Sequence, residues 1–300
     1  MSRPKSGYRD FMDSLTAHKT WRTLEPIHAM VYFAAQPAAK YTALGVTEPR
    51  MGYFASRAAA LGQAGEHQVI ATFYNFNPSL VRKSIPAAWQ VASPQQFLDA
   101  RLSGVDAALR SVWSDEMLAS SEFKQVVTML RQAAEVACEH PEGRALFAAH
   151  ADVPWPDEAH LIAWHAQTLL REFRGDGHIA MLVAEGLSGI EALITHAASG
   201  DIPADLLQKS RAWSDDEWAA GVLGLQARGL LQHGATLAFS EQGKQMRDRI
   251  EAQTDVLSLA PYAALGAQAC DLLRAIGRPF SKAVVDGGLL GTATSRFSQE

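Results

Sequence analysis

The sequence predicts a mainly α-helical fold, with an N-terminal helical domain followed by a C-terminal winged-helix-like domain that carries a small β-hairpin. Apolar residues recur at helical spacing over most of the chain, helix-start signals precede many of these stretches, and residues 190–257 follow the order helix, helix, helix, hairpin, helix. The 300 residues, 48% of them hydrophobic, suffice for two domains. We place these domains at residues 1–186 and 187–278, with a flexible tail over 279–300.

The first part of the helical domain reads as a series of short helices. Residues 9–44 are amphipathic, with interruptions at Pro26 and Pro37, and predict two or three helices. A further helix is expected over residues 50–61, before a glycine that suits a helix C-terminus. Residues 69–76 are rich in β-branched and aromatic side chains, which favours a strand. Because no partner strand is apparent nearby, we expect a helix there as well.

The next helices are marked by a polar residue followed by proline, because proline fits the first helical turn. Such pairs predict a helix after Asn77 and another over residues 94–113. A longer helix over 158–173 should end at the glycines of 175–177, and the chain should resume as a helix over 178–185. The sequence therefore predicts a helix boundary inside the segment REFRGDGH.

The last third of the chain has the signals of a winged helix. Helices over residues 190–198 and 205–209 precede a third helix, which begins at Ser214 with Glu217 three positions later. This serine and glutamate form a capping box, so the start of the third helix is well determined. The segment QHGATLAF then predicts a short hairpin, and SEQGKQMRDRIE opens another capped helix.

Two family resemblances follow from these segments. The succession of helix, ARGLL, hairpin and SEQGKQMRDRIE resembles the winged helix of MarR-type regulators, over about residues 190–257. From about residue 21 to 278 the chain resembles a family of actinobacterial proteins that carry a helix-turn-helix label. This resemblance implies a two-part architecture and no particular reaction. It is carried by LEPIHAMVYF, MGYFASRAAALG, ATFYNFNP, WHAQTLLREFRGDGH, GLSGIEALITHA and RAWSDDEW.

The charge distribution argues against DNA as a partner. The chain has a net charge of −5, and residues 201–255 contain nine acidic and six basic side chains, a net charge of −3. The helix that would enter the major groove begins with Asp215, Asp216 and Glu217. Because affinity for DNA depends mainly on neutralising phosphates, we expect this chain not to bind DNA.

The densest polar cluster in an apolar setting is WHAQTLLREFRGDGHIAML. On a helix, His165 and Glu172 fall on one stripe, and Asp176 should cap the helix that begins near His178. Carboxylates near imidazoles and arginines suit general acid–base catalysis, because one group can be held protonated and another ionised. We therefore predict these four residues as catalytic.

The predicted ligand of this cluster is an acidic small molecule. Arg171 and Arg174 have the guanidinium geometry that clamps a carboxylate or phosphate. Arg57, Tyr74 and Asn75 form a second group, in which aromatic and polar side chains can line a pocket. Both groups also fit a structural explanation, as an ion-pair network and as ordinary core packing, and the sequence leaves these alternatives open.

No cofactor or metal is predicted. The sequence lacks HExxH and HxH spacings, a P-loop, GxGxxG and GxSxG, and its two cysteines lack CxxC spacing. His28 and His196 each stand alone on an apolar helical face, as core histidines do. Only their convergence with His165 and His178 would create a metal site.

Three functions remain open at this point. The first is an enzyme that applies acid–base chemistry to an acidic metabolite in a pocket of the helical domain, with the winged helix used for structure or protein contacts. The alternative is a ligand-responsive winged-helix transcription regulator. A third possibility is an interaction module whose acidic winged helix docks a protein partner or a second copy of the chain, as a homodimer. No stretch reaches the roughly 20 apolar residues of a membrane helix, and the N-terminus lacks the apolar core of a signal peptide, so we expect a cytoplasmic protein without membrane contact.

Overall fold

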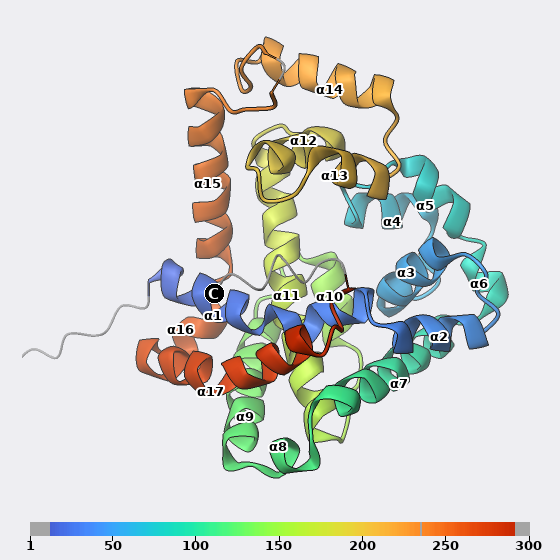
Figure 1. Cartoon of the computed structure of the whole chain (residues 1–300), viewed down its shortest axis with the longest axis vertical. Helices are drawn as coiled ribbons and strands as arrows, with labels where there is room; N and C mark the ends of the chain where they lie inside the picture. The colour runs from blue at the N-terminus through green and yellow to red at the C-terminus, as the bar shows by residue number, and fades with distance from the viewer. Residues whose placement is uncertain (1–12, 235, 292–300) are drawn as a thin grey trace, which may run out of the picture.

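The computed structural model describes residues 13–234 and 236–291, which form helices almost throughout (Figure 1). The predicted mainly helical fold is confirmed. In chain order the helices are α1 (Ser14–Ala29), η1 (Met30–Tyr32), α2 (Ala35–Ala43), α3 (Pro49–Ala58), η2 (Ala59–Leu61), α4 (Glu66–Thr72), α5 (Pro78–Ser84), α6 (Ala88–Val91), α7 (Pro94–Val112), α8 (Asp115–Ala119), α9 (Ser121–Cys138), α10 (Ala145–Ala151), α11 (Ala159–Ala184), α12 (Gly189–Ala198), α13 (Ala204–Ser210), α14 (Asp215–Ala227), α15 (Glu241–Leu257), α16 (Ala260–Leu265) and α17 (Ala267–Asp286).

Two hydrophobic cores occupy the larger part of the molecule. The first is built from α1, α7, α9, α11 and α17, and it buries Leu24 and Phe280. The second lies among α2 to α7 and buries Phe54 and Phe97. Although α17 is last in the chain, it packs along α1 (Figure 1). Removal of these large apolar side chains from water stabilises the arrangement.

Helices α12 to α15 gather at one end of the long helix α11 (Figure 1). Their core includes Leu182 near the end of α11, Leu225 of α14 and Ile250 of α15. From this end α15 runs beside α11 towards the first core. The capping box at the start of α14 is present as predicted, because the Ser214 hydroxyl accepts from the Glu217 amide at 3.2 Å and the Glu217 carboxylate accepts from the Ser214 amide at 2.9 Å.

The predicted β-hairpin between α14 and α15 is wrong for the described residues. They contain one isolated antiparallel bridge, between Leu231 and Phe239, and no strand. Beside the bridge, the Gln232 amide donates to the Ala238 carbonyl at 3.0 Å. Since α15 already begins at Glu241, the chain enters a helix before a longer ladder can form.

The predicted helix boundary at residues 175–177 is also wrong, because α11 runs unbroken from Ala159 to Ala184. A Cβ atom on Gly177 would lie 3.4 Å from the Cβ atom of Leu257, so this glycine lets α15 approach α11 closely. Such tertiary packing offsets the roughly 1 kcal/mol by which glycine disfavours a helix. Asp176 and His178 therefore both lie inside α11, and Asp176 does not cap a helix at His178.

The predicted flexible tail over residues 279–300 is wrong for its first part. Helix α17 continues to Asp286, and Phe280 and Val284 are buried in the first core. These apolar residues follow helical spacing and pack against α1 and α9, which holds the segment in place. Residues 292–300 of the predicted tail lie outside the described residues. The proposed division between residues 186 and 187 stays a prediction.

Within the described ranges, no single helix has the length and apolar character needed to cross a membrane. In the part of the chain that the structure describes, only α11 and α12 taken together pass that test of length and composition, and the two helices are bent by 101° at their junction.

Candidate functional site

Helix α11 carries many buried polar side chains. Burying a polar group costs free energy unless it finds a hydrogen-bond or ion-pair partner, so the partners of each group indicate its role. The polar residues of α11 that are more than nine-tenths buried are His160, His165, Gln167, Thr168, Glu172 and Arg174.

Glu172 lies between two guanidinium groups. Its Oε1 atom is 3.3 Å from Nη2 of Arg57 on α3, and its Oε2 atom is 2.6 Å from Nη1 of Arg171. Burial alone would raise the pKa of this carboxyl, but the charges of Arg171 and Arg57 hold the pKa of Glu172 well below its usual range. Glu172 is therefore ionised at neutral pH.

Aromatic rings surround Arg57. Its guanidinium carbon is 4.5 Å from the ring centroid of Phe73, 5.2 Å from that of Tyr32 and 5.4 Å from that of Tyr53. The Nη1 atom of Arg57 also donates to the Tyr53 hydroxyl at 2.7 Å. Because the cation faces both π systems and a carboxylate, its position is fixed by several interactions at once.

His28 connects α1 to the same cluster. Its Nδ1 atom is 3.0 Å from the Thr168 hydroxyl, its Nε2 atom is 2.7 Å from the Tyr32 hydroxyl, and its ring stacks on Trp164. Burial and the neighbouring arginines lower the pKa of His28 well below its ordinary value, so the ring is neutral at pH 7. The i, i+4 spacing of His28 and Tyr32 is the sequence signal for this pair.

His165 lies near this cluster without a hydrogen bond to Glu172 among the described residues. Its ring makes an edge contact with Trp155, with ring centroids 4.8 Å apart. Burial, and then the charge of Arg101 on α7, lower the pKa of His165 to about 4. His150 on α10 is close enough to interact electrostatically with Arg101, His165 and Glu172.

Arg101 and His150 are buried beside the predicted site, but neither was predicted as a site residue from the sequence. Arg101 stands alone on the apolar face that α7 forms with Phe97, Val105 and Ala108, and this pattern is visible in the sequence. His150 has no such signal, because it lies in a short helix whose burial depends on α11.

Asp176 and His178 face other partners. The Oδ2 atom of Asp176 accepts a hydrogen bond from the Phe147 amide at 3.0 Å, so this carboxyl provides a partner for a backbone N–H in the first turn of α10. Burial raises the pKa of Asp176 to about 6. The Nδ1 atom of His178 is 3.0 Å from the Thr254 hydroxyl of α15, and burial lowers the pKa of His178 to about 3.

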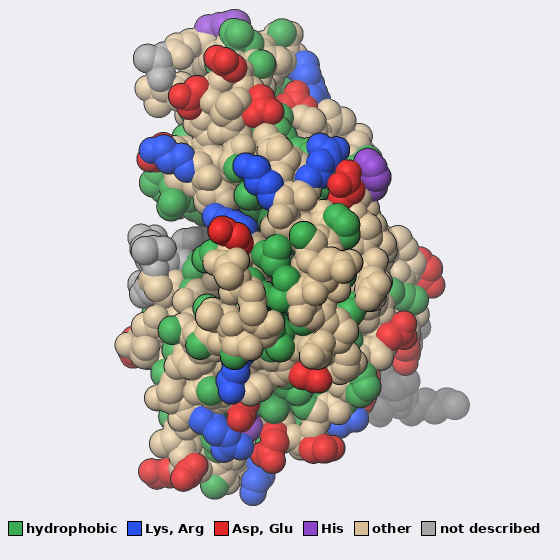
Figure 2. Space-filling view, turned by 90° about the vertical axis from the view of Figure 1, so that its right-hand side faces the viewer, with side chains coloured by type: hydrophobic (Ala, Val, Ile, Leu, Met, Phe, Trp, Pro, Cys, Tyr) green, Lys and Arg blue, Asp and Glu red, His purple; other side chains and the backbone are tan. Residues whose placement is uncertain are grey.

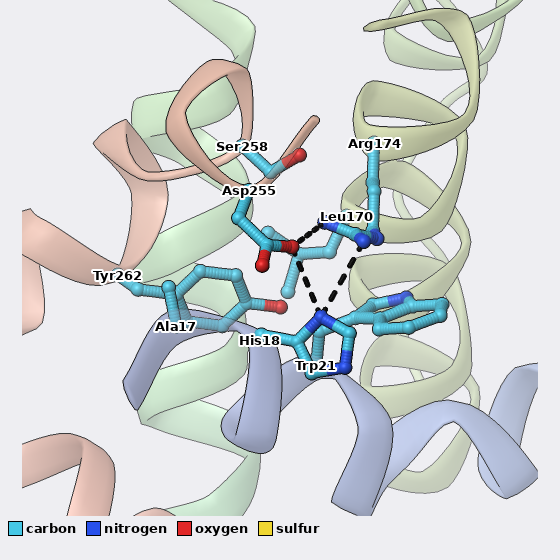
Figure 3. A pocket seen from close by; sticks show the side chains of 8 residues that line it. All are labelled: Ala17, His18, Trp21, Leu170, Arg174, Asp255, Ser258 and Tyr262. Atoms are coloured by element: carbon cyan, nitrogen blue, oxygen red, sulfur yellow. Dashed lines mark hydrogen bonds and ion pairs between the residues drawn. The ribbon is translucent and has the colours of Figure 1, made fainter. Parts of the chain in front are cut away.

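Arg174 belongs to a separate network that ties together α1, α11 and α15 (Figure 3). Its Nη1 atom is 2.6 Å from Oδ1 of Asp255, and Nδ1 of His18 is 2.9 Å from the same oxygen. The Arg174 guanidinium also covers the Trp21 ring, and the Tyr262 side chain borders the small pocket beside it. This network links helices that are distant in sequence.

Tyr74 and Asn75 lie where the larger part of the molecule meets α12 to α14. The Tyr74 hydroxyl donates to the carbonyl of Leu187, and the Trp213 indole donates to the carbonyl of Asn75 at 3.0 Å. A Cβ atom on Gly189 would lie only 2.0 Å from the Tyr74 carbonyl oxygen, so the backbone contact requires glycine. These two residues form a junction between helices.

The same junction reaches the first turn of α14. The Asn77 amide donates to the Glu217 carboxylate at 3.1 Å, and its backbone N–H donates to the Arg211 carbonyl at 3.0 Å. Phe76 lies between the Arg211 guanidinium, 4.8 Å away, and the Tyr53 ring, 5.5 Å away. Residues 73–77 thus contact both the surroundings of Arg57 and the start of α14.

The structure brings together only part of the predicted site. Arg57, Arg171 and Glu172 form one cluster with His165 nearby. The remaining predicted residues lie at other contacts, namely Tyr74, Asn75, Arg174, Asp176 and His178. Across residues 13–234 and 236–291, no three His, Cys, Asp or Glu side chains gather in a way that could hold a metal ion.

Comparison with known proteins gives one family. No curated protein and no solved structure matches the chain. A family model described as a helix-turn-helix family matches residues 17–291, which is nearly the whole chain and includes both the α11 cluster and α12 to α15. On this match, the chain belongs to that helix-turn-helix family.

Proposed function

We propose that this chain is a ligand-responsive helix-turn-helix protein in which α14 binds a second copy of the chain rather than DNA. The observation that carries the proposal is the surface of α14, which is exposed and uncharged beyond an acidic first turn. In a helix-turn-helix protein that reads DNA, the second helix of the motif enters the major groove, and here that helix is α14.

The exposed face of α14 is an apolar stripe. Ala219, Ala220, Leu223 and Ala227 are all exposed and follow one another at intervals that place them along one side of the helix. Leu223 is 65% exposed, whereas Leu225 on the opposite side is fully buried. Small side chains beside one large apolar residue allow another helix to approach closely.

The charges of α14 disfavour contact with phosphates. Its first turn presents Asp215, Asp216 and Glu217, and residues 218–227 contain no charged side chain. On the face shown in Figure 2, Lys and Arg side chains are scattered among acidic ones and form no continuous patch. An interface without clustered basic side chains lacks the electrostatic contribution that dominates DNA binding.

A second copy of the chain fits this surface. In an antiparallel pairing of two α14 helices about a two-fold axis, each apolar stripe covers the other. Arg228 at the end of α14 is engaged within its own chain by Glu191 and by the carbonyls of Glu185 and Gly186, so the pairing rests on the apolar stripe. The antiparallel arrangement also sets the dipoles of the two α14 helices in opposite directions, which is favourable.

The ligand-responsive part of the proposal is supported by the contacts of residues 73–77. Glu172 forms an ion pair with Arg57, and the Arg57 guanidinium packs on the rings of Phe73 and Tyr53. The Tyr53 ring in turn packs on Phe76. From there Asn77 bonds Glu217 of α14. A change in the buried cluster would therefore move side chains that touch the first turn of α14.

The acid–base interpretation of the same cluster has weaker support. A general base works best when its pKa lies near the working pH. The low pKa of Glu172 makes it a permanent counter-ion for Arg57 and Arg171 instead. Asp176 and His178, which would have completed the acid–base set, contact Phe147 and Thr254.

Sedimentation equilibrium over about 1 to 200 µM tests the self-association. A contact made by one helix per subunit is small, so we expect a weak dimer, with a Kd on the order of 10 to 100 µM. Leu223→Lys should leave only monomer. The matched control is Val183→Lys on α11, because Val183 is an exposed apolar residue of similar accessibility, at 58%, and this variant should dimerise as the wild type does.

Sequence-selective binding of DNA would overturn the proposal that α14 binds a second copy of the chain. Selection from a random pool of duplexes at 150 mM salt should enrich no sequence, and fluorescence anisotropy should show no binding below about 10 µM protein. Enrichment of one duplex motif, with loss of binding in Leu223→Glu, would assign α14 to DNA. A wild type that stays monomeric at 200 µM would exclude the second copy.

A further inference from the structure

Arg101 is a buried cation without an acidic partner. Its residue is only 2% exposed, and no carboxylate within the described ranges lies at ion-pair distance from it. Its Nη1 atom donates to the Ser56 carbonyl at 3.3 Å, and its guanidinium lies 5.0 Å from the centroid of the Trp164 ring. Its Nε and Nη2 atoms have no hydrogen-bond partner among residues 13–234 and 236–291.

This arrangement contrasts with three other guanidinium groups on or beside α11, those of Arg57, Arg171 and Arg174. Arg57 and Arg171 share the carboxylate of Glu172, and Arg174 pairs with Asp255. An arginine stays protonated in a protein, so burial of Arg101 leaves a full positive charge to be compensated. A buried charge is normally paired, because leaving it alone is very costly.

Two histidines beside Arg101 are also incompletely bonded. His150 and His165 are 3% and 4% exposed, and the Nε2 atom of each has no hydrogen-bond partner among the described residues. Burial, with Arg101 next, lowers the pKa of His150 to about 3 and that of His165 to about 4, so both rings are neutral. A neutral imidazole can donate one N–H to an acceptor. The indole Nε1 of Trp164 is a further buried donor that has no partner in the described part of the chain.

We propose that Arg101, His150, Trp164 and His165 form a binding site for a small carboxylate. The free atoms Nε and Nη2 lie on one edge of the guanidinium plane, and that edge binds the two oxygens of a carboxylate through parallel hydrogen bonds. This proposal gives the chemical class of the ligand in the ligand-responsive function proposed above. It rests on that function only for the expected effect of the bound ligand on α14.

The charge of the site selects a carboxylate over phosphate. One guanidinium compensates one negative charge, and the neighbouring histidines are neutral donors. A phosphate carrying close to two negative charges at pH 7 would leave one of them unpaired in a buried site, which is costly. A planar anion with a single charge matches both the geometry and the charge of this site.

The site adjoins the contacts that lead to α14. Arg101 donates to the carbonyl of Ser56, and the next residue, Arg57, pairs with Glu172 and packs on Phe73. A carboxylate that draws the Arg101 guanidinium towards itself would therefore act on the α3 backbone next to Arg57.

Thermal melts of the full chain with sodium acetate as the probe test the proposal. At equal ionic strength, acetate should raise the Tm of the wild type above its value in sodium chloride by about 2 to 5 °C at tenfold excess over its Kd, and phosphate should not. Arg101→Met should lose this shift, and its Tm in chloride should equal or exceed that of the wild type, because an unpaired buried charge is removed. Arg110→Met, on an exposed arginine of the same helix, should keep the acetate shift.

The competing explanation is that Arg101 is purely structural, held by Trp164 and Ser56. In that case Arg101→Met lowers the Tm in chloride, and acetate has no effect on the wild type beyond that of chloride. If Arg101→Met does not fold, Arg101→Lys and line broadening of ¹³C-labelled acetate in NMR replace it, since lysine keeps the charge without the bidentate edge. Binding that persists unchanged in Arg101→Lys would overturn the proposal. Self-association through α14 is measured without acetate, so the two proposals fail separately.

Discussion

Glu172 shows what a single buried carboxylate does in this protein. With Arg57 and Arg171 on either side, it neutralises charge in the middle of α11 and fixes Arg57 among its aromatic neighbours. The sequence placed Glu172 and His165 on one helical stripe, and that part of the geometry could be predicted from helical spacing. Its partner Arg57 could not, because the two residues are 115 positions apart and only tertiary packing brings them together.

The variant Glu172→Gln measures this role. It leaves two guanidinium groups without their counter-ion in a buried position, so we expect a loss of about 3 to 5 kcal/mol in the free energy of unfolding, measured by urea denaturation. The matched control is Glu158→Gln, which removes an exposed partner of Arg110 and should cost less than about 1 kcal/mol. Equal effects of the two variants would contradict the counter-ion role.

Buried neutral histidines make the stability depend on pH. The pKa of His165 falls from 6.5 in the unfolded chain to about 4 in the folded protein, so the unfolded state binds more protons between these values. Its contribution to stability is present above pH 6.5 and is lost as the pH falls towards 4. For this residue alone the loss from pH 7 to pH 4 is about 3 kcal/mol.

Replacing His165 by Gln should flatten this dependence. Urea denaturation of the wild type and of His165→Gln at pH 7, 5.5 and 4 gives the two slopes, and we expect the variant to lose less stability on acidification than the wild type. His67→Gln is the control, because His67 is exposed and its replacement should leave the slope as it is. Parallel curves for wild type and His165→Gln would show that His165 does not remain neutral in the folded protein.

Helix α11 and the junction at residues 73–77 show which elements sequence patterns can predict. The predicted start of α14 is correct, because its capping box is a local sequence signal formed by Ser214 and Glu217. The break expected at residues 175–177 was wrong, because the packing of Leu257 against Gly177 is a tertiary effect. The prediction of a hairpin was wrong for a related reason. The early start of α15 shortens the segment that could pair as two strands.

The junction has a direct mutational test at Gly189. A Cβ atom there would overlap the carbonyl oxygen of Tyr74, so Gly189→Ala should lower the free energy of unfolding by about 1 to 3 kcal/mol. The matched control is Gly224→Ala on α14, whose Cβ atom would make only an ordinary contact, with Glu191 at 3.8 Å. That control should be neutral or stabilising by up to about 1 kcal/mol, because alanine favours a helix. Thermal denaturation of both variants gives their changes in stability. A loss in Gly189→Ala alone reports the steric overlap at the junction, whereas similar changes in both variants would report only the preference of alanine for a helix.

At the level of the whole molecule, long-range polar contacts connect parts that hydrophobic cores alone would leave independent. Arg174 joins α11 to α1 and α15 through Asp255 and His18, and residues 73–77 join the second core to α14. The mainly helical fold and the order of α12 to α15 could be predicted from periodicity and capping. The position of the buried polar groups could not, because it depends on contacts between helices that are far apart in sequence.

We infer that the buried cluster at α11 and the first turn of α14 are coupled through residues 73–77. Hydrogen–deuterium exchange of Tyr53→Phe tests it most directly, because this change removes only the hydroxyl that accepts from Arg57. Loss of one such hydrogen bond corresponds to about 0.5 to 1.5 kcal/mol, or a roughly 2- to 10-fold faster exchange in the coupled segments. The control is Tyr41→Phe, a buried tyrosine of the second core.

We expect faster exchange of residues 73–77 and of the first turn of α14 in Tyr53→Phe, with α9 unchanged and with no such effect in Tyr41→Phe. Faster exchange confined to α3 and α11, with residues 73–77 and α14 at wild-type rates, would contradict this coupling.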